Sequence, residues 1–179
     1  MKEKLTVSDS KKLFHEKFPY VISGLYKRII DEMLVELNLL KHQNEFEQEE
    51  LFCVGLTETF KELTNDYKPK DHLDILFESL CRSSNFEPNK IKEISEDTLR
   101  IYKDKSFKEI LNLLKEKRKG NLYSSRILNL GIYIIFSNSN DFENLDDNEK
   151  NKIISEIIKY LDLSVSRSEK DIGLYKTSL

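Results

Sequence analysis

The chain has 179 residues, of which 39% are hydrophobic and 34% charged, enough for one domain with a hydrophobic core and a highly charged surface. Its formal net charge is only −3, so it lacks the basic excess typical of nucleic-acid binding, and we expect no nucleic-acid partner. No apolar signal segment begins the chain, and the longest nearly apolar run, 127–136, is far shorter than the roughly 20 residues that span a bilayer. We therefore expect a soluble protein whose membrane association is at most peripheral.

Helix-period patterns follow one another through the first half of the chain, and none alternates like a β-strand. Ser8 is the predicted N-cap of a short first helix. A second helix is predicted over 23–42 and a third over about 51–63. Pro69 and Pro88 each suit the first position of a further helix, because a proline there forfeits no intrahelical hydrogen bond.

The second half of the chain continues the same helical pattern. Ser106 is the predicted cap of a helix that ends in the basic sequence KEKRKG. The segment 128–136 is apolar almost all round, which is typical of a helix in the middle of a bundle. The Asp-Asp pair at 146–147 begins the next helix. These patterns predict an all-α, single-domain bundle of about eight helices, with a helical core domain at 1–163.

Residues 164–179 carry a different pattern, predicted to be the start of a C-terminal coiled-coil-like helix. Four apolar residues and Ser168 follow one another at intervals of 3, 4, 3 and 4 residues, which is the spacing of heptad a and d positions. The candidate interaction face of this tail consists of Val165, Ile172, Tyr175 and Leu179.

The helix predicted over 23–42 has charged residues close to its apolar arc. On a helical wheel that arc contains Leu25, Ile29, Ile30, Met33, Leu37 and Leu40. The polar face is expected at Lys27, Asp31, Asn38, Lys41 and His42. Arg28, Glu32 and Glu36, however, follow at i, i+4 and i+8 along the border of the arc. A buried or half-buried structural network is favoured over an exposed partner site, and its candidate members are Tyr26, Arg28, Asp31, Glu32 and Glu36.

Two segments resemble each other within the chain, LFCVGLTETF at 51–60 and ILNLGIYIIF at 127–136. Both place an apolar residue four positions before a glycine, Gly55 or Gly131, and a phenylalanine five positions after it. Because a mid-helix glycine costs about 1 kcal/mol relative to alanine, each is a candidate for close helix packing. The alternative is two related halves around a binding groove.

No motif for catalysis, metal binding or a cofactor is found. None of the three histidines, His15, His42 and His72, belongs to an HExxH or an ExxH motif, and the five glycines are scattered. Cys53 and Cys81 form no CxxC and are expected to be reduced, buried thiols. The basic sequence KEKRKG is either a solvated helix C-terminus, which is favoured, or a contact for an anionic membrane. We expect no catalytic, metal or cofactor site, and no enzyme.

Several segments, in order along nearly the whole chain, resemble the thylakoid formation protein family of cyanobacteria and plastids. They are TVSDSKKLFHEKFP, LYKRIIDEMLVELNLL, LFCVGL, LFESLC, SRILNLGIY and RSEKDIGLYKTSL. The resemblance is most specific in the pattern Y-x-R-x-x-D-E-x-L-V-E, which runs from Tyr26 to Glu36.

This resemblance implies a non-enzymatic accessory factor in thylakoid membrane biogenesis and photosystem II assembly or repair. It further implies an FtsH-type thylakoid protease and photosystem II assembly components as partners. The expected location is cytoplasmic, peripheral to the cytoplasmic face of the thylakoid membrane. The alternative is a pigment- or lipid-binding helical protein at the thylakoid surface, which requires an apolar pocket between the glycine-bearing helices.

Overall fold

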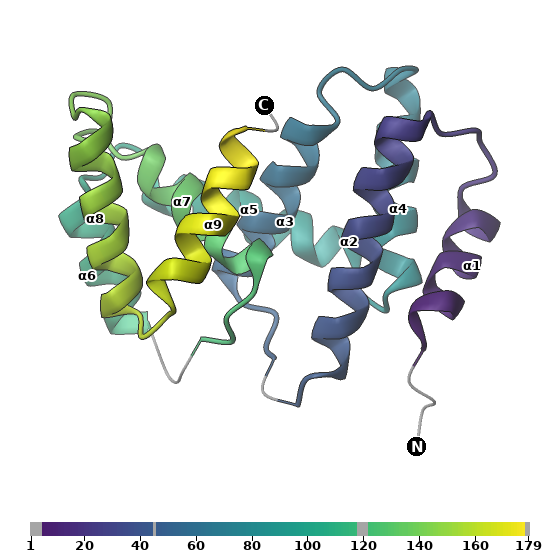
Figure 1. Cartoon of the computed structure of the whole chain (residues 1–179), viewed down its shortest axis with the longest axis horizontal. Coiled ribbons are helices and arrows are strands. Elements are labelled where there is room, and N and C mark those ends of the chain that lie inside the picture. The colour runs from purple at the N-terminus through teal and green to yellow at the C-terminus, as the bar shows by residue number, and fades with distance from the viewer. Residues whose placement is uncertain (1–4, 45, 118–121, 178–179) are drawn as a thin grey trace. The chain divides into compact units, whose positions relative to one another are not determined.

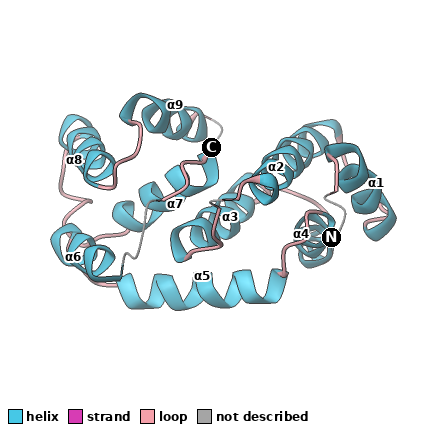
Figure 2. Ribbon diagram, turned by 90° about the horizontal axis from the view of Figure 1, so that it is seen from below, coloured by secondary structure: helices cyan, strands magenta, loops and turns pink. Residues whose placement is uncertain are grey.

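The structure, a computed structural model, describes residues 5–44, 46–117 and 122–177 and is all-helical in these ranges (Figures 1 and 2). Its helices are α1 (Val7–Lys17), α2 (Gly24–His42), α3 (Glu50–Leu63), the 3-10 helix η1 (Lys70–His72), α4 (Leu73–Ser83), α5 (Pro88–Tyr102), α6 (Phe107–Lys117), α7 (Arg126–Ser137), α8 (Asp147–Tyr160) and α9 (Val165–Lys176). The predicted all-α class is therefore confirmed, and the predicted helices are all found.

Short-range side-chain hydrogen bonds fix where several helices begin. At α8 the expected cap is confirmed, because Asp146 and Glu149 form a reciprocal capping box. At α1 the predicted cap, Ser8, is wrong: Thr6 is the N-cap, and it shares a capping box with Asp9. Pro69 precedes η1 instead of opening α4, so a 3-10 turn leads into that helix.

The chain divides into two compact units, each held together mainly by contacts among its own residues. The first consists of residues up to 46 and residues 60–92, and the second of residues 47–59 and residues from 93 onward. The units meet at 46/47, 59/60 and 92/93, and none of these is the expected boundary at 163/164. Helix α9 belongs to the second unit together with α6, α7 and α8.

Each unit has its own buried apolar side chains. In the first unit they come mainly from α1, α2 and α4, with Phe18 directly after α1, and include Phe14, Phe18, Leu34, Leu37, Leu76 and Leu80. In the second unit α7 supplies the largest share, with Leu128, Leu130, Ile132, Ile135 and Phe136 all buried. The prediction that 128–136 lies inside a bundle is confirmed for most of its residues. Among the described helices, none is long and apolar enough to cross a membrane.

Candidate functional site

The buried side of α2 is rotated from the predicted apolar arc, although Ile30, Met33, Leu37 and Leu40 belong to both. Leu25, expected in the apolar arc, is 67% exposed. The buried stripe is rotated toward residues that the wheel placed at its edge or beyond, and it consists of Ile30, Met33, Leu34, Leu37, Asn38 and Leu40. The expected polar face is therefore wrong for Asn38, which is almost completely buried.

Helix α1 covers α2 through polar contacts on that side. The Nδ2 of Asn38 donates to the backbone oxygen of Leu5 at 2.8 Å and to Oγ of Ser10 at 2.9 Å. Two turns before Asn38 on the same helix, Asp31 forms an ion pair with Lys11 of α1 at 3.2 Å. The sequence gives no signal for the buried amide, because an asparagine on a wheel is ordinarily read as solvent-facing.

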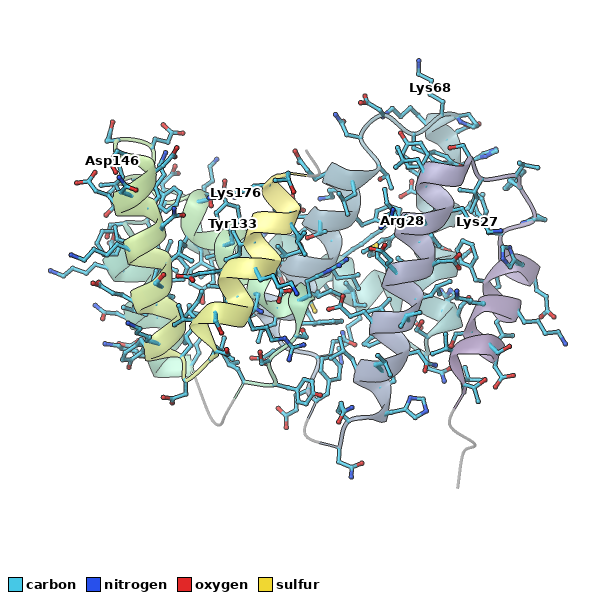
Figure 3. All side chains as sticks on the ribbon, viewed as in Figure 1. Lys27, Arg28, Lys68, Tyr133, Asp146 and Lys176 are labelled. Atoms are coloured by element: carbon cyan, nitrogen blue, oxygen red, sulfur yellow. The ribbon has the colours of Figure 1, made fainter. Side chains whose placement is uncertain are left out.

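The charged row on α2 lies on the exposed side of the helix. Nε of Arg28 donates to Oε1 of Glu32 at 3.0 Å, and the two side chains are 81% and 47% exposed. Glu36, farther along the row, is half-buried. The favoured expectation of a buried or half-buried network is therefore wrong for Arg28 and Glu32, because both lie away from the buried stripe of α2. Figure 3 labels Arg28 and its neighbour Lys27 on α2.

Tyr26, another member of the candidate network, contacts an aromatic residue of the first unit. Its ring meets that of Tyr67 edge to face, with centroids 5.0 Å apart. Tyr67 is buried, and this burial raises the pKa of its phenol. Among the candidate residues, Tyr26 and Asp31 thus contact neighbouring parts of the first unit, and Arg28 and Glu32 form an exposed pair.

Gly55 and Gly131 face each other where α3 crosses α7 in the second unit. A Cβ on Gly55 would overlap the backbone oxygen of Ile127 and lie 2.9 Å from the backbone nitrogen of Gly131. A Cβ on Gly131 would overlap the backbone oxygen of Leu51 and lie 3.1 Å from the backbone nitrogen of Gly55. The contact is reciprocal, since each glycine meets the carbonyl four residues before the other. This geometry agrees with the close-packing interpretation, and at this crossing the two backbones leave no space for a groove.

The heptad residues of α9 pack within their own unit. Ile172 is buried in the apolar core of that unit, and Val165 and Tyr175 pack against the same core. The ring of Tyr175 also contacts that of Tyr133 on α7, with centroids 6.3 Å apart. Leu179 lies outside the described residues. For the three described positions, the expected free face is covered by the protein itself.

A polar cluster that the sequence did not indicate connects α3, α5 and α6. The hydroxyl of the buried Tyr102 donates to Glu50 at 2.9 Å, and Nζ of Lys117 forms an ion pair with the same carboxylate at 3.1 Å. Burial and the Glu50 carboxylate raise the pKa of Tyr102 far above its ordinary value, so the phenol stays protonated and remains a donor. Lys117 thus has an intramolecular partner, whereas Arg118 and Lys119 of the basic sequence lie outside the described residues.

The described residues contain no group of three or more His, Cys, Asp or Glu side chains arranged to hold a metal ion. Cys53 and Cys81, both among the described residues, are buried and form no disulfide.

These features define an all-α protein that presents an outward face of mixed apolar and charged residues on α2. The family model described as "Thylakoid formation protein" matches residues 6–179. The chain belongs to this family, and the resemblance seen in the sequence is confirmed.

Relatives and a solved structure agree with this assignment. Protein Thf1 of Prochlorococcus marinus subsp. pastoris is 73% identical over 179 residues, covering 100% of this chain and 89% of the relative. Protein Thf1 of Prochlorococcus marinus strain NATL1A is 41% identical over 184 residues, covering 100% of this chain and 92% of the relative. The solved structure of Psb29 matches with a TM-score of 0.82 at 24% identity, over 96% of this chain and 95% of that one. At that identity the structural likeness supports the fold alone.

Proposed function

We propose that this protein is a non-enzymatic accessory factor in thylakoid membrane biogenesis and in photosystem II assembly or repair. Membership of a family described by thylakoid formation supports the first part. We include in the proposal a peripheral position at the cytoplasmic face of the thylakoid membrane. Its partners in this proposal are an FtsH-type protease and photosystem II assembly components.

The observation that carries the proposal is the outer face of α2, formed by Leu25, Arg28, Glu32 and Leu39. The two leucines are 67% and 53% exposed, on either side of the Arg28–Glu32 ion pair. One exposed leucine is ordinary on a protein surface, but two on one helix face beside a charged pair resemble a protein contact site. In such sites apolar side chains supply the binding energy and charged neighbours supply specificity.

The exposed leucines and the ion pair on this face add little to the stability of the fold. An exposed ion pair between positions i and i+4 contributes only about 0.3–0.5 kcal/mol. Leucines left in water contribute no burial energy at all. A partner that covers the outer face of α2 would bury both leucines and dehydrate the ion pair, which accounts for the combination.

The test uses the full chain carrying an affinity tag, crosslinked in thylakoid membranes, with the captured proteins identified by mass spectrometry. Two variants alter the outer face of α2, Arg28→Ala and the double change Leu25→Ser with Leu39→Ser. The matched control is Arg100→Ala on α5, because Arg100 forms an exposed ion pair with Asp97 and the two side chains are 79% and 51% exposed.

Wild type and Arg100→Ala are expected to capture protease or photosystem II subunits, and both outer-face variants are expected to lose them. Thermal unfolding of Arg28→Ala should stay within about 0.5 kcal/mol of wild type, so that lost capture reports on binding and not on folding. Equal capture by all forms would refute the role of this face. Failure of wild type to capture any such subunit would refute the proposed function itself.

A further inference from the structure

Helix α9 contains a glycine, Gly173, that helix packing does not explain. Glycine lowers helix stability relative to alanine, so a glycine within a helix requires a reason. At Gly55 and Gly131 the reason is contact between two backbones. A Cβ built on Gly173, in contrast, has no atom of another part of the structure within 4 Å. Open space therefore lies beside Gly173.

Gly173 is exposed, and it lines an open cavity of about 320 Å³ formed by α7, α8 and α9, entirely within the second unit. Its volume lies at the lower end of the range of small-molecule sites, roughly 300–1,000 Å³. Its walls are largely apolar and include Tyr133 from α7, Phe142 from the segment before α8, Ile154 from α8 and Ile172 from α9. Figure 3 shows Tyr133 and Lys176 beside each other on α7 and α9.

Two lysines line the same cavity. Nζ of Lys150 lies 5.4 Å from the centre of the Phe142 ring, and Nζ of Lys176 lies 5.0 Å from the centre of the Tyr133 ring. Within the described residues, neither lysine forms an ion pair. Each cation thus lies over an aromatic wall and, among the described residues, has no carboxylate oxygen within 4.0 Å.

One carboxylate, Glu169, also lines the cavity and contributes a negative charge. Its Oε1 accepts a hydrogen bond from Oγ of Ser155 at 2.8 Å. The charged lining residues are therefore two lysines and one glutamate. The walls favour an apolar group, and the lysines favour an anion next to it.

We propose that this cavity binds an amphiphile with an acyl chain and an anionic head group. The chain lies against Phe142, Ile154 and Ile172, where the absence of a side chain at Gly173 leaves it room. The head group lies between Lys150 and Lys176. A fatty-acid carboxylate and the phosphate of an anionic membrane lipid present the same chemistry to this site. This inference concerns a different helix group from the outer face of α2 and does not depend on it.

The first experiment titrates the full chain with cis-parinaric acid, a fatty acid whose fluorescence rises in apolar surroundings. The variant Gly173→Leu fills the cavity while improving the helix propensity of α9. Gly24→Leu is the matched control, because a Cβ at Gly24 also has nothing within 4 Å and this residue lies in the first unit. Affinity is expected to fall roughly tenfold or more in Gly173→Leu and to stay at the wild-type value in Gly24→Leu.

The second experiment tests the charges. The double change Lys150→Gln with Lys176→Gln is compared with Lys152→Gln and Lys170→Gln, which lie on the same two helices but do not line the cavity. Removing the lining lysines is expected to weaken parinarate binding about tenfold or more, and the control pair should bind as wild type does. The uncharged methyl ester of the same acid should bind wild type as weakly as the acid binds the lysine variant.

Flotation with vesicles distinguishes the two sources of the ligand. With membrane lipid as the source, wild type floats with phosphatidylglycerol vesicles better than with phosphatidylcholine vesicles, and Gly173→Leu loses this preference. With free acid as the source, parinarate binds and the two proteins do not differ in flotation. Wild type that fails to bind parinarate, or a folded Gly173→Leu that binds it with unchanged affinity, would overturn the proposal.

Discussion

Replacing Gly131 with alanine is expected to destabilise the fold, although alanine is the better helix former. The added Cβ would overlap the backbone oxygen of Leu51, lie 2.9 Å from its carbonyl carbon and lie 3.1 Å from the backbone nitrogen of Gly55. All of these atoms belong to a helix backbone, so no side chain can rotate away. The two helices must instead move apart until these distances reach ordinary van der Waals contact, 3.4–4 Å.

The expected loss combines two destabilising contributions with one that stabilises. Forcing an extra methyl group into a packed core costs about 1–3 kcal/mol, and a rigid backbone contact belongs at the upper end of this range. Separating α3 from α7 also weakens dispersion contacts along the whole crossing, since a gap of roughly 0.5–1 Å forfeits a quarter to a half of each. Alanine restores about 1 kcal/mol of helix propensity. The net destabilisation is therefore about 2 kcal/mol, or roughly 4–8 °C in melting temperature for a chain of this size.

Urea denaturation followed by the helical circular-dichroism signal measures this change. Gly173→Ala is the matched control, since its Cβ meets nothing within 4 Å, and it should stabilise the protein by up to about 1 kcal/mol. Gly55→Ala should resemble Gly131→Ala. The double variant should lose less than the sum of the two, because the first substitution already separates the helices. A Gly131→Ala protein as stable as Gly173→Ala would refute the backbone-contact account.

Three further predictions concern polar groups and use melting temperature as the measurement. Asn38→Ala should cost about 1–3 kcal/mol, because it removes hydrogen bonds to the buried Ser10 hydroxyl and to the backbone oxygen of the half-buried Leu5; a loss like that of a surface asparagine would contradict this role. Tyr102→Phe should cost about 1 kcal/mol through the lost bond to Glu50, and an unchanged melting temperature would show that the bond adds nothing. Hydrogen bonds from Ser106 lower the pKa of Glu109, so its stabilisation is present above the ordinary value of 4.5 and is lost as the pH falls through the lower, folded value. Glu109→Gln should therefore melt below wild type near pH 7, and the difference should shrink in acid; a constant difference would rule out this linkage.

Helices and their caps could be predicted from the sequence because they depend on residues close together in the chain. The pairs Ser106–Glu109 and Asp146–Glu149 lie three residues apart and form the expected contacts. Thr6 was missed because Thr6 and Ser8 are both good capping residues, and only the position of Asp9 favours the former.

The orientation of α2 could not be predicted in the same way, because it depends on which neighbour covers the helix. A wheel weighted by apolar residues includes Leu25 and leaves out Asn38. In the fold, the carbonyl of Leu5, just before α1, and the hydroxyl of Ser10 in α1 offset the desolvation cost of the Asn38 amide. Those partners are 28 and 33 residues away in the chain, and no local pattern indicates them. The packing of α9 could not be predicted for a related reason. Heptad spacing does not indicate whether the apolar residues pack against another chain or, as Tyr175 does, against α7 of the same chain.

The internal resemblance between 51–60 and 127–136 acquires a physical basis in the α3–α7 crossing. Each segment contains a glycine and, four residues earlier, the carbonyl that faces the glycine of the other segment. Such an arrangement also allows weak Cα–H contacts to those carbonyls, as in other close helix crossings. The resemblance is thus explained by packing within one unit, and a binding groove is not needed to account for it.

The best-recognised pattern in the chain, from Tyr26 to Glu36, combines two physical roles on one helix. Tyr26 and Asp31 form contacts within the first unit, so replacing them would disturb folding. Arg28 and Glu32 form an exposed pair whose loss changes stability little. Arg100 and Asp97 form a pair of nearly the same exposure on α5, so the ion pair alone cannot distinguish a docking site. The difference on α2 is that two exposed leucines lie on the same face, and for this reason we place the partner contact there.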